Sequence, residues 1–332
     1  MTIAVVGAGA IGGLLGAYLV RSGQEVVLIA RGPHLAAMQK RGLTVRHGGD
    51  EFTTRPECTD DIRAIGRADV VFLTLKAHSI PAVAEALGSA LAGGACVVGA
   101  QNGIPWWYYK DRHLETVDPG GIIARSIPYR SVVGCIAYPA AEVVEPGVIE
   151  HVEGNRFTLG EPDGSRSERV LSISSRLTGA GLKAPIQSRI RNEIWLKVLG
   201  NATLNPVSAL TGATLAEIVT SPASRELVKT LMEEVDAVAR AVGAEVPLST
   251  EKRMAGAAAT GAHKTSMLQD LEAARPLEVD ALVGAVVELA DGAGVPVPSL
   301  RTVYGLTKLL DQTRRGQRDQ IQRAQRDQTR RA

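Results

Sequence analysis

The sequence is poor in cysteine and has no evident metal-binding pattern. Its three cysteines, Cys58, Cys96 and Cys135, lie far apart, and no CxxC pair or Cys/His cluster has the spacing of metal ligands. An odd number of separated cysteines argues against a disulfide framework and favours a reducing compartment. The six histidines also lack ligand spacing, which disfavours a metal-dependent enzyme.

Strong net charge and long apolar runs are also absent. The formal net charge is only +2, so neither nucleic acid nor a membrane surface is expected as a partner. No apolar run approaches the roughly 18 residues that a membrane span needs. The chain opens on a strand-like run at residues 2–6, without the pattern of a signal peptide. We therefore expect a cytoplasmic protein.

What the chain does contain is enough apolar sequence for two domains. It has 332 residues, of which 45% are hydrophobic and 22% charged, as in globular proteins. The first half alternates strand-like and helical segments, and its near-continuous apolar strands are typical of a parallel sheet covered on both faces. The predicted strands are residues 3–6, 25–30, 70–75, 95–100, 131–137, 148–152, 157–160 and 182–187, the later ones in a more antiparallel extension.

From about residue 189 the pattern becomes helical. We expect helices at residues 192–204, 215–219, 224–242, 266–273, 276–292 and 299–310. The predicted fold is thus an N-terminal Rossmann-like, doubly wound α/β domain (1–187) and an all-α C-terminal domain (188–312). Residues 313–332 are almost entirely Arg, Gln, Asp and Thr, which predicts a disordered tail or a solvated helix. The alternative is a basic tail that contacts an anion or a partner.

A glycine-rich loop follows the first strand and opens an amphipathic helix, the context in which GxGxxG predicts dinucleotide binding. The first glycine permits a tight turn, the second lets the backbone approach a pyrophosphate, and the third allows close packing of helix and strand. The pyrophosphate would sit on free amides at the positive end of the helix. The candidate residues are Gly7, Ala8, Gly9, Ala10, Ile11 and Gly12.

The end of the second strand indicates which dinucleotide is bound. NAD enzymes usually place a carboxylate there to bind the adenosine ribose, whereas this chain has Arg31. A guanidinium can pair with a 2′-phosphate, so NADP(H) is the expected cofactor. The alternative is a solvent-facing arginine.

Three further segments complete a family pattern. They are Thr74-Leu75-Lys76-Ala77, Gln101-Asn102-Gly103, and Trp195-Leu196-Lys197 with its following asparagines. Two later segments also match the pattern: Ser266-Met267-Leu268-Gln269-Asp270 and Glu278-Val279-Asp280. In this order, behind the glycine loop, they resemble the ketopantoate reductase (2-dehydropantoate 2-reductase) family over about residues 1–310.

The resemblance implies NADPH-dependent reduction of ketopantoate, a small 2-keto acid, to (R)-pantoate in pantothenate biosynthesis. It implies that Lys76 and Asn102 contact the cofactor and that Lys197 is the proton donor. It also implies that Glu278 helps to order the closed complex with cofactor and substrate. The implied substrate-binding residues are Asn201, Asn205 and Ser266. The chain could also form a homodimer.

The spacing of three of these residues gives an independent check. Lys197, Asn201 and Asn205 are four residues apart, so a helix places them in one stripe. A stripe of one cation and two amides suits a cleft that binds a carboxylate and a hydroxyl; the alternative is a stripe that faces water. Pro206 is expected to kink or end the helix. Since cofactor and proton donor are on different domains, the active site is expected between them.

Two departures from the family pattern leave the substrate open. An aromatic insertion at residues 104–109 directly follows Asn102, and it could line the active-site mouth or simply pack on the fold. Leu215 and residues 134–137 are less polar than the family pattern. The alternatives are a related reductase or dehydrogenase of another 2-keto or 2-hydroxy acid, and a non-catalytic NADPH-binding sensor.

Overall fold

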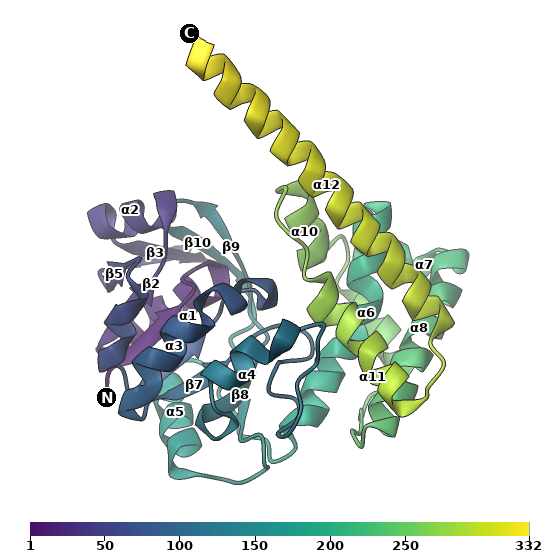
Figure 1. Ribbon diagram of the computed structural model, residues 1–332, viewed down its shortest axis with the longest axis horizontal. Helices are drawn as coiled ribbons and strands as arrows, with labels where there is room; N and C mark the ends of the chain where they lie inside the picture. Colours follow the sequence, from purple (N-terminus) through teal and green to yellow (C-terminus); the bar gives the residue numbers. More distant parts are fainter. Residues whose placement is uncertain (332) are drawn as a thin grey trace. The chain divides into compact units, whose positions relative to one another are not determined.

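The computed structural model describes the backbone of residues 1–331, and the side chains except those of residues 67, 90, 92 and 318–331. It divides into two compact units, Met1–Glu193 and the residues from Ile194 onward (Figure 1). The division falls a few residues after the predicted boundary, inside the first turn of helix α6 (Ile190–Thr211). This turn is held by the first unit: Arg191 donates to the carbonyl of Tyr108 at 2.9 Å, and Glu193 accepts from the hydroxyl of Tyr138 at 2.9 Å.

The first unit is built on a seven-stranded sheet in the order β11-β8-β7-β6-β1-β2-β5. All neighbours are parallel except β11 and β8, so the predicted doubly wound sheet is confirmed. Six of its strands are buried at every residue, which is why apolar runs predicted them. The strands are β1 (Ile3–Val6), β2 (Val26–Ile29), β5 (Glu57–Thr59), β6 (Val70–Leu73), β7 (Cys96–Gly99), β8 (Val132–Ala137) and β11 (Phe157–Gly160).

Strand order reverses at β1. The chain passes from β1 outward to β2 and β5, then crosses back to β6 on the other side of β1. In the register, Val6 aligns with Ile29 of β2 and with Leu73 of β6, so the three strands end together. The carboxyl ends of strands at such a reversal form the crevice in which open α/β sheets bind ligands.

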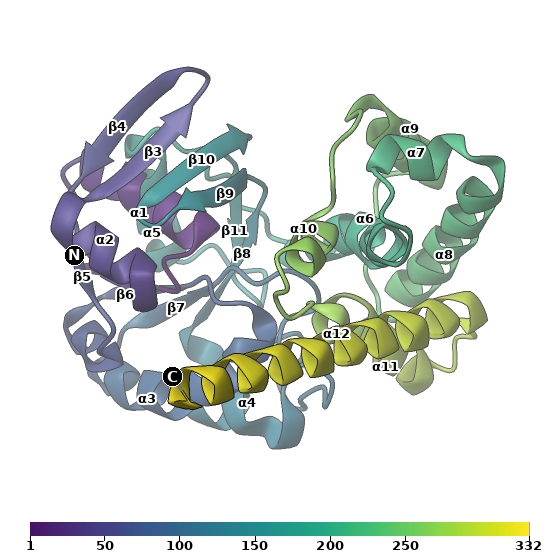
Figure 2. The same cartoon turned by 90° about the horizontal axis from the view of Figure 1, so that it is seen from above.

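A second, four-stranded sheet was not predicted as a separate sheet, although one of its strands, β10, matches the predicted strand at residues 148–152. Its order is β4-β3-β10-β9, with β3 (Leu43–His47), β4 (Asp50–Thr54), β9 (Ala140–Glu145) and β10 (Val148–Glu153) (Figure 2). Helix α1 (Ala10–Arg21) lies between the two sheets, and its glycines permit the close approach: a Cβ on Gly16 would meet Leu28 of β2, and one on Gly13 would meet Ile149 of β10. The predicted strand at 182–187 is wrong, because only isolated bridges at Lys183 and Ile186 form there.

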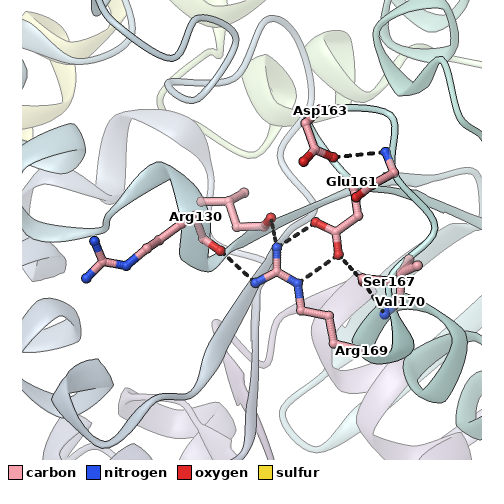
Figure 3. A network of polar contacts seen from close by, with 8 residues as sticks. Arg130, Glu161, Asp163, Ser167, Arg169 and Val170 are labelled. Carbon is pink, nitrogen blue, oxygen red and sulfur yellow. Dashed lines mark hydrogen bonds and ion pairs between the residues drawn. The ribbon is translucent and has the colours of Figure 1, made fainter.

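A buried ion pair fixes the far edge of the main sheet to helix α5 (Glu168–Gly179), as Figure 3 shows. Glu161 is 2% exposed and accepts from Nε of Arg169 at 2.7 Å. The same guanidinium donates to the carbonyls of Arg130 at 2.7 Å and Val132 at 3.1 Å. This sharing of one cation among three acceptors holds β11, the start of β8 and α5 together.

The second unit is helical, as predicted. Its elements after α6 are α7 (Leu215–Thr220), α8 (Pro222–Ala241), α9 (Thr250–Ala259), α10 (Ser266–Glu272), the π-helix η7 (Asp280–Gly284), α11 (Ala285–Ala293) and α12 (Pro298–Arg331). Helix α8 packs against α7, α9, α11 and α12. Among the described residues, no helix combines the length and apolarity that crossing a bilayer would require.

Three helix predictions need correction. Helix α6 does not end at Pro206 but continues to Thr211, because the residues around the proline are buried on all sides and packing outweighs the lost hydrogen bond. Helix α9 was missed, and the single helix predicted over residues 276–292 begins later, as η7 followed by α11. Residues 313–331, for which the sequence left a disordered tail or a solvated helix open, continue α12 to Arg331; Arg, Gln and Ala favour helix, and no proline interrupts them.

Candidate active site

Two of the three loop glycines are required by close contacts within the loop, and the third leaves space beside it open. Gly7 has a φ of +102°, and a Cβ there would lie 2.9 Å from the backbone nitrogen of Leu75. A Cβ on Gly12 would overlap the hydroxyl of Thr74 and the carbonyl of Gly7, so glycine is needed for helix and strand to touch. The Cβ position of Gly9 has no atom within 4 Å and faces open space. The loop thus leaves room for a ligand at Gly9.

The start of α1 also has the electrostatics of an anion site. The N-cap is Gly9, which offers no side-chain hydrogen bond, and the first turn has no acidic residue. Among the described residues, the amides of Ala10 and Ile11 have no hydrogen-bond partner. Free amides at the positive end of a helix attract phosphate. These features fit the pyrophosphate of a dinucleotide.

Two residues that sequence reasoning did not assign hold this edge in shape. The hydroxyl of Thr74 donates to the carbonyls of Val6 at 3.1 Å and Gly7 at 2.9 Å, tying the loop to β6. The side-chain amide of Gln101 donates to the carbonyl of Leu73, tying β7 to β6. Both lie in the quoted motifs, beside the residues that were assigned, so their sequence position was the available signal.

The predicted cofactor residues of the first unit all follow adjacent strands at the same sheet edge. Lys76 follows β6, Asn102 follows β7, and Arg31 follows β2 at the N-cap of α2 (Gly32–Arg41). Because β7, β6, β1 and β2 are parallel neighbours, the structure brings these positions and the glycine loop to one edge. Arg31 is exposed, so its guanidinium is available to a ligand.

His34 lies beside the loop and was also missed. Its Nδ1 accepts from the amide of Gly147 at 3.0 Å, joining α2 to the turn between β9 and β10. Burial lowers the pKa of His34, an effect partly opposed by the nearby backbone of Ala8. The imidazole is therefore neutral at pH 7, and we assign it a structural role.

In the second unit, one continuous helix carries the polar stripe. Lys197 and Asn201 are half-buried and Asn205 is buried, all on α6. Their flanking residues are largely buried apolar side chains: Trp195, Val198, Leu199, Ala202 and Leu204. A cation and two amides spaced one turn apart on a largely buried helix can bind an anion and a hydroxyl. The alternative of a fully water-facing stripe is inconsistent with this burial.

Glu278 lies in a segment that is anchored on both sides to α12. Before it, the amide of Leu277 donates to the buried carboxylate of Asp311 at 3.0 Å. After it, Asp280 accepts from the hydroxyl of Tyr304 at 2.7 Å and from Nζ of Lys308 at 2.8 Å. A π-helix follows directly, a feature often found at functional sites. Ser266 is the exposed first residue of α10.

The aromatic insertion is partly core and partly cavity wall. Trp107 packs on the last residue of β7 and the middle of β8, because a Cβ on Gly99 or Gly134 would contact its indole at 2.8 Å and 2.7 Å. A cavity of about 260 Å³ lies beside it. Its walls are aromatic and mainly basic, and include Trp106, Trp107, Tyr109, Lys110, Arg112, Arg125 and Tyr129. The glycines at 99 and 134 therefore make space for the insertion.

Comparisons with known proteins agree with this architecture. Residues 3–164 match the family described as "Ketopantoate reductase PanE/ApbA", and residues 189–311 match the C-terminal part of the same family. A 2-dehydropantoate 2-reductase of Mesorhizobium japonicum is 44% identical over 318 residues, covering 93% of this chain and 98% of that protein. One from Halobacterium salinarum is 31% identical, covering 93% and 98%.

Solved structures give the same result. The crystal structure of a candidate ketopantoate reductase from Ralstonia solanacearum superposes with a TM-score of 0.90 at 41% identity, covering 94% of this chain and 98% of that one. The 2-dehydropantoate 2-reductase of Geobacter metallireducens has a TM-score of 0.83 at 26% identity, covering 93% and 99%. Both halves of the chain match over nearly their whole length, and the chain belongs to the ketopantoate reductase family of oxidoreductases.

Proposed function

We propose that this protein reduces ketopantoate to (R)-pantoate with NADPH, a step of pantothenate biosynthesis. The observation that carries the proposal is the combination of a glycine-loop anion site at the strand reversal with the Lys197-Asn201-Asn205 stripe on α6. A non-catalytic NADPH sensor would need the first feature and not the second. The 44% identity to a 2-dehydropantoate 2-reductase supports this substrate over other 2-keto acids.

NADP(H) fits the first unit at several points. The pyrophosphate would lie over the open side of Gly9, on the amides of Ala10 and Ile11. Arg31 would pair with the 2′-phosphate, for which a planar guanidinium is well matched. Lys76 and Asn102 would contact the nicotinamide side. When bound, the cofactor supplies the hydride that adds to the ketone carbon.

The residues of the second unit would manage charge and protons. As hydride adds, negative charge develops on the ketone oxygen, and the ammonium of Lys197 would stabilise it and then donate its proton. Asn201, Asn205 and Ser266 would hold the substrate by neutral hydrogen bonds. Glu278, fixed by the anchors on either side, would orient Lys197 or a substrate hydroxyl.

The proton-donor role is tested by Lys197→Ala. We expect turnover of ketopantoate to fall by roughly two to four orders of magnitude, because a positioned acid contributes about that much. The NADPH Kd, measured by cofactor fluorescence, should change little. Near-normal turnover in this variant would remove Lys197 from the mechanism.

The cofactor preference is tested by Arg31→Ala. Loss of a charge-assisted pair to the 2′-phosphate should raise the Kd for NADPH roughly tenfold or more and leave that for NADH nearly constant. Arg166→Ala, an exposed arginine elsewhere in the same unit, is the matched control. Equal losses for both cofactors would refute the 2′-phosphate assignment.

A further inference from the structure

An arginine from another helix lies against α6, at a position next to the polar stripe. A Cβ built on Gly200 would overlap Nη2 of Arg253 and lie 2.5 Å from its Nε and 2.6 Å from its Cζ. The guanidinium of Arg253 thus occupies the space that a side chain at position 200 would fill. Arg253 is half-buried on α9, between the N-cap Ser249 and the buried Met254 and Ala257.

The position of Gly200 on α6 brings this cation near the stripe. Gly200 immediately precedes Asn201 and is three residues after Lys197. At 3.6 residues per turn, a three-residue step leaves the direction of Gly200 only about 60° around the helix from that of Lys197. The guanidinium therefore flanks the stripe at the level between Lys197 and Asn201.

A 2-keto acid carries a negative charge that the asparagines of the stripe can hydrogen-bond but do not neutralise. Its carboxylate is bonded directly to the ketone carbon, so both groups must be held within one small site. If the ammonium of Lys197 serves the ketone oxygen, the asparagines leave the carboxylate with neutral donors only. A guanidinium is permanently charged, and its planar fork matches a carboxylate with two parallel hydrogen bonds.

We infer that Arg253 binds the carboxylate of the 2-keto acid beside the Lys197-Asn201 stripe, and that Gly200 is glycine because it admits the guanidinium. This inference rests on the proposed function.

Two different substitutions can remove the guanidinium from this place. Arg253→Gln deletes the charge at similar length, whereas Gly200→Ala keeps the arginine and displaces it with a methyl group. The displaced atoms are the far end of a flexible side chain, so Gly200→Ala should still fold. Lys252→Gln, which removes an exposed neighbouring charge from the same helix, is the matched control.

The measurement is a steady-state assay at saturating NADPH with ketopantoate and with its neutral lactone, which keeps the ketone and lacks the carboxylate. We expect KM for ketopantoate to rise roughly tenfold to a hundredfold in both variants, the effect of losing a charged hydrogen bond. The preference for acid over lactone should fall by the same factor. The NADPH Kd, the activity on the lactone and the control variant should stay near wild type.

Each other outcome has a definite meaning. An unchanged KM and an unchanged acid-to-lactone preference in Arg253→Gln would overturn the inference while leaving the proposed function in place. Equal losses on acid and lactone, with a lower melting temperature, would also overturn it, because they indicate a purely structural arginine. A wild-type protein that reduces no 2-keto acid would overturn the proposed function itself.

Discussion

The glycine loop allows cofactor binding and folding to be separated by two substitutions three residues apart. In Gly9→Ala the new methyl group meets no protein atom within 4 Å, and the backbone is at φ −80°, which alanine tolerates. Alanine is a slightly poorer N-cap than glycine, so the free energy of unfolding should fall by less than about 1 kcal/mol. The same methyl group stands where the pyrophosphate would lie.

Gly12→Ala places its methyl group quite differently. The new Cβ would overlap the hydroxyl of Thr74 and the carbonyl of Gly7, and would lie 3.0 Å from Cγ1 of Val5. Two of these three contacts are to backbone or to a hydroxyl held by two hydrogen bonds, so the helix must shift away from the strand. Overpacking of this kind costs about 1 to 3 kcal/mol. At about 2 to 4 °C per kcal/mol for a domain of this size, the melting temperature should fall by roughly 2 to 12 °C.

The assay is thermal unfolding of the cofactor-free protein together with NADPH titration by fluorescence. We expect Gly9→Ala to melt within a few degrees of wild type and to bind NADPH roughly tenfold or more weakly, and Gly12→Ala to melt clearly lower. Normal NADPH affinity in Gly9→Ala would refute the position of the pyrophosphate. Normal stability in Gly12→Ala would refute the close packing of α1 on β1 and β6.

Other predictions concern titratable groups and the buried ion pair. Burial lowers the pKa of His34 below its unfolded value of 6.5, so its contribution to the free energy of unfolding is complete above pH 6.5 and is lost as pH falls. The melting temperature of wild type should therefore fall more between pH 7 and pH 5 than that of His34→Gln. Equal falls in the two proteins would contradict this. Glu161→Gln leaves the guanidinium of Arg169 without its carboxylate. The free energy of unfolding, measured in urea, should fall by about 2 to 3 kcal/mol, less than for a wholly buried pair because Arg169 is 33% exposed. A fall of under about 0.5 kcal/mol would contradict a stabilising role for this ion pair. Burial raises the pKa of Cys58 and Cys96 to about 11. At pH 8 both thiols should therefore react with a thiol reagent roughly a hundredfold more slowly in the folded protein than in the unfolded protein. Rapid labelling of either cysteine in the folded protein would contradict its burial.

The main sheet and the glycine loop were predictable because their signals are local. A strand covered on both faces is apolar at every residue, so β1, β6 and β7 stand out in the sequence. The second sheet has no such signal. Strand β9 is exposed over most of its length, and β4 opens with two exposed acidic residues, so their pairing partners rather than their composition make them strands.

The candidate site was predictable where it lies on one element and not where it is assembled from two. The four-residue spacing of Lys197, Asn201 and Asn205 could be read from α6 alone. Thr74 and Gln101 lay inside recognised motifs, but their role depends on which strand lies beside them. Arg253 lies in no recognised motif. No signal in the sequence indicated its position, because the helix that carries it was missed and its neighbour Gly200 on α6 is more than fifty residues away in sequence.

Glycines inside helices show why such contacts elude sequence reasoning. A glycine in a helix interior costs about 1 kcal/mol relative to alanine, so one that persists in a well-packed helix indicates that something must come close. The sequence displays Gly13, Gly16 and Gly200 equally plainly. In the structure a different side chain contacts each glycine. Gly13 is contacted by Ile149 of the second sheet, Gly16 by Leu28 of the first sheet, and Gly200 by the guanidinium of Arg253. A missing side chain therefore marks where a close approach occurs, and the chemistry of the approaching group decides whether the contact is core packing or a binding site.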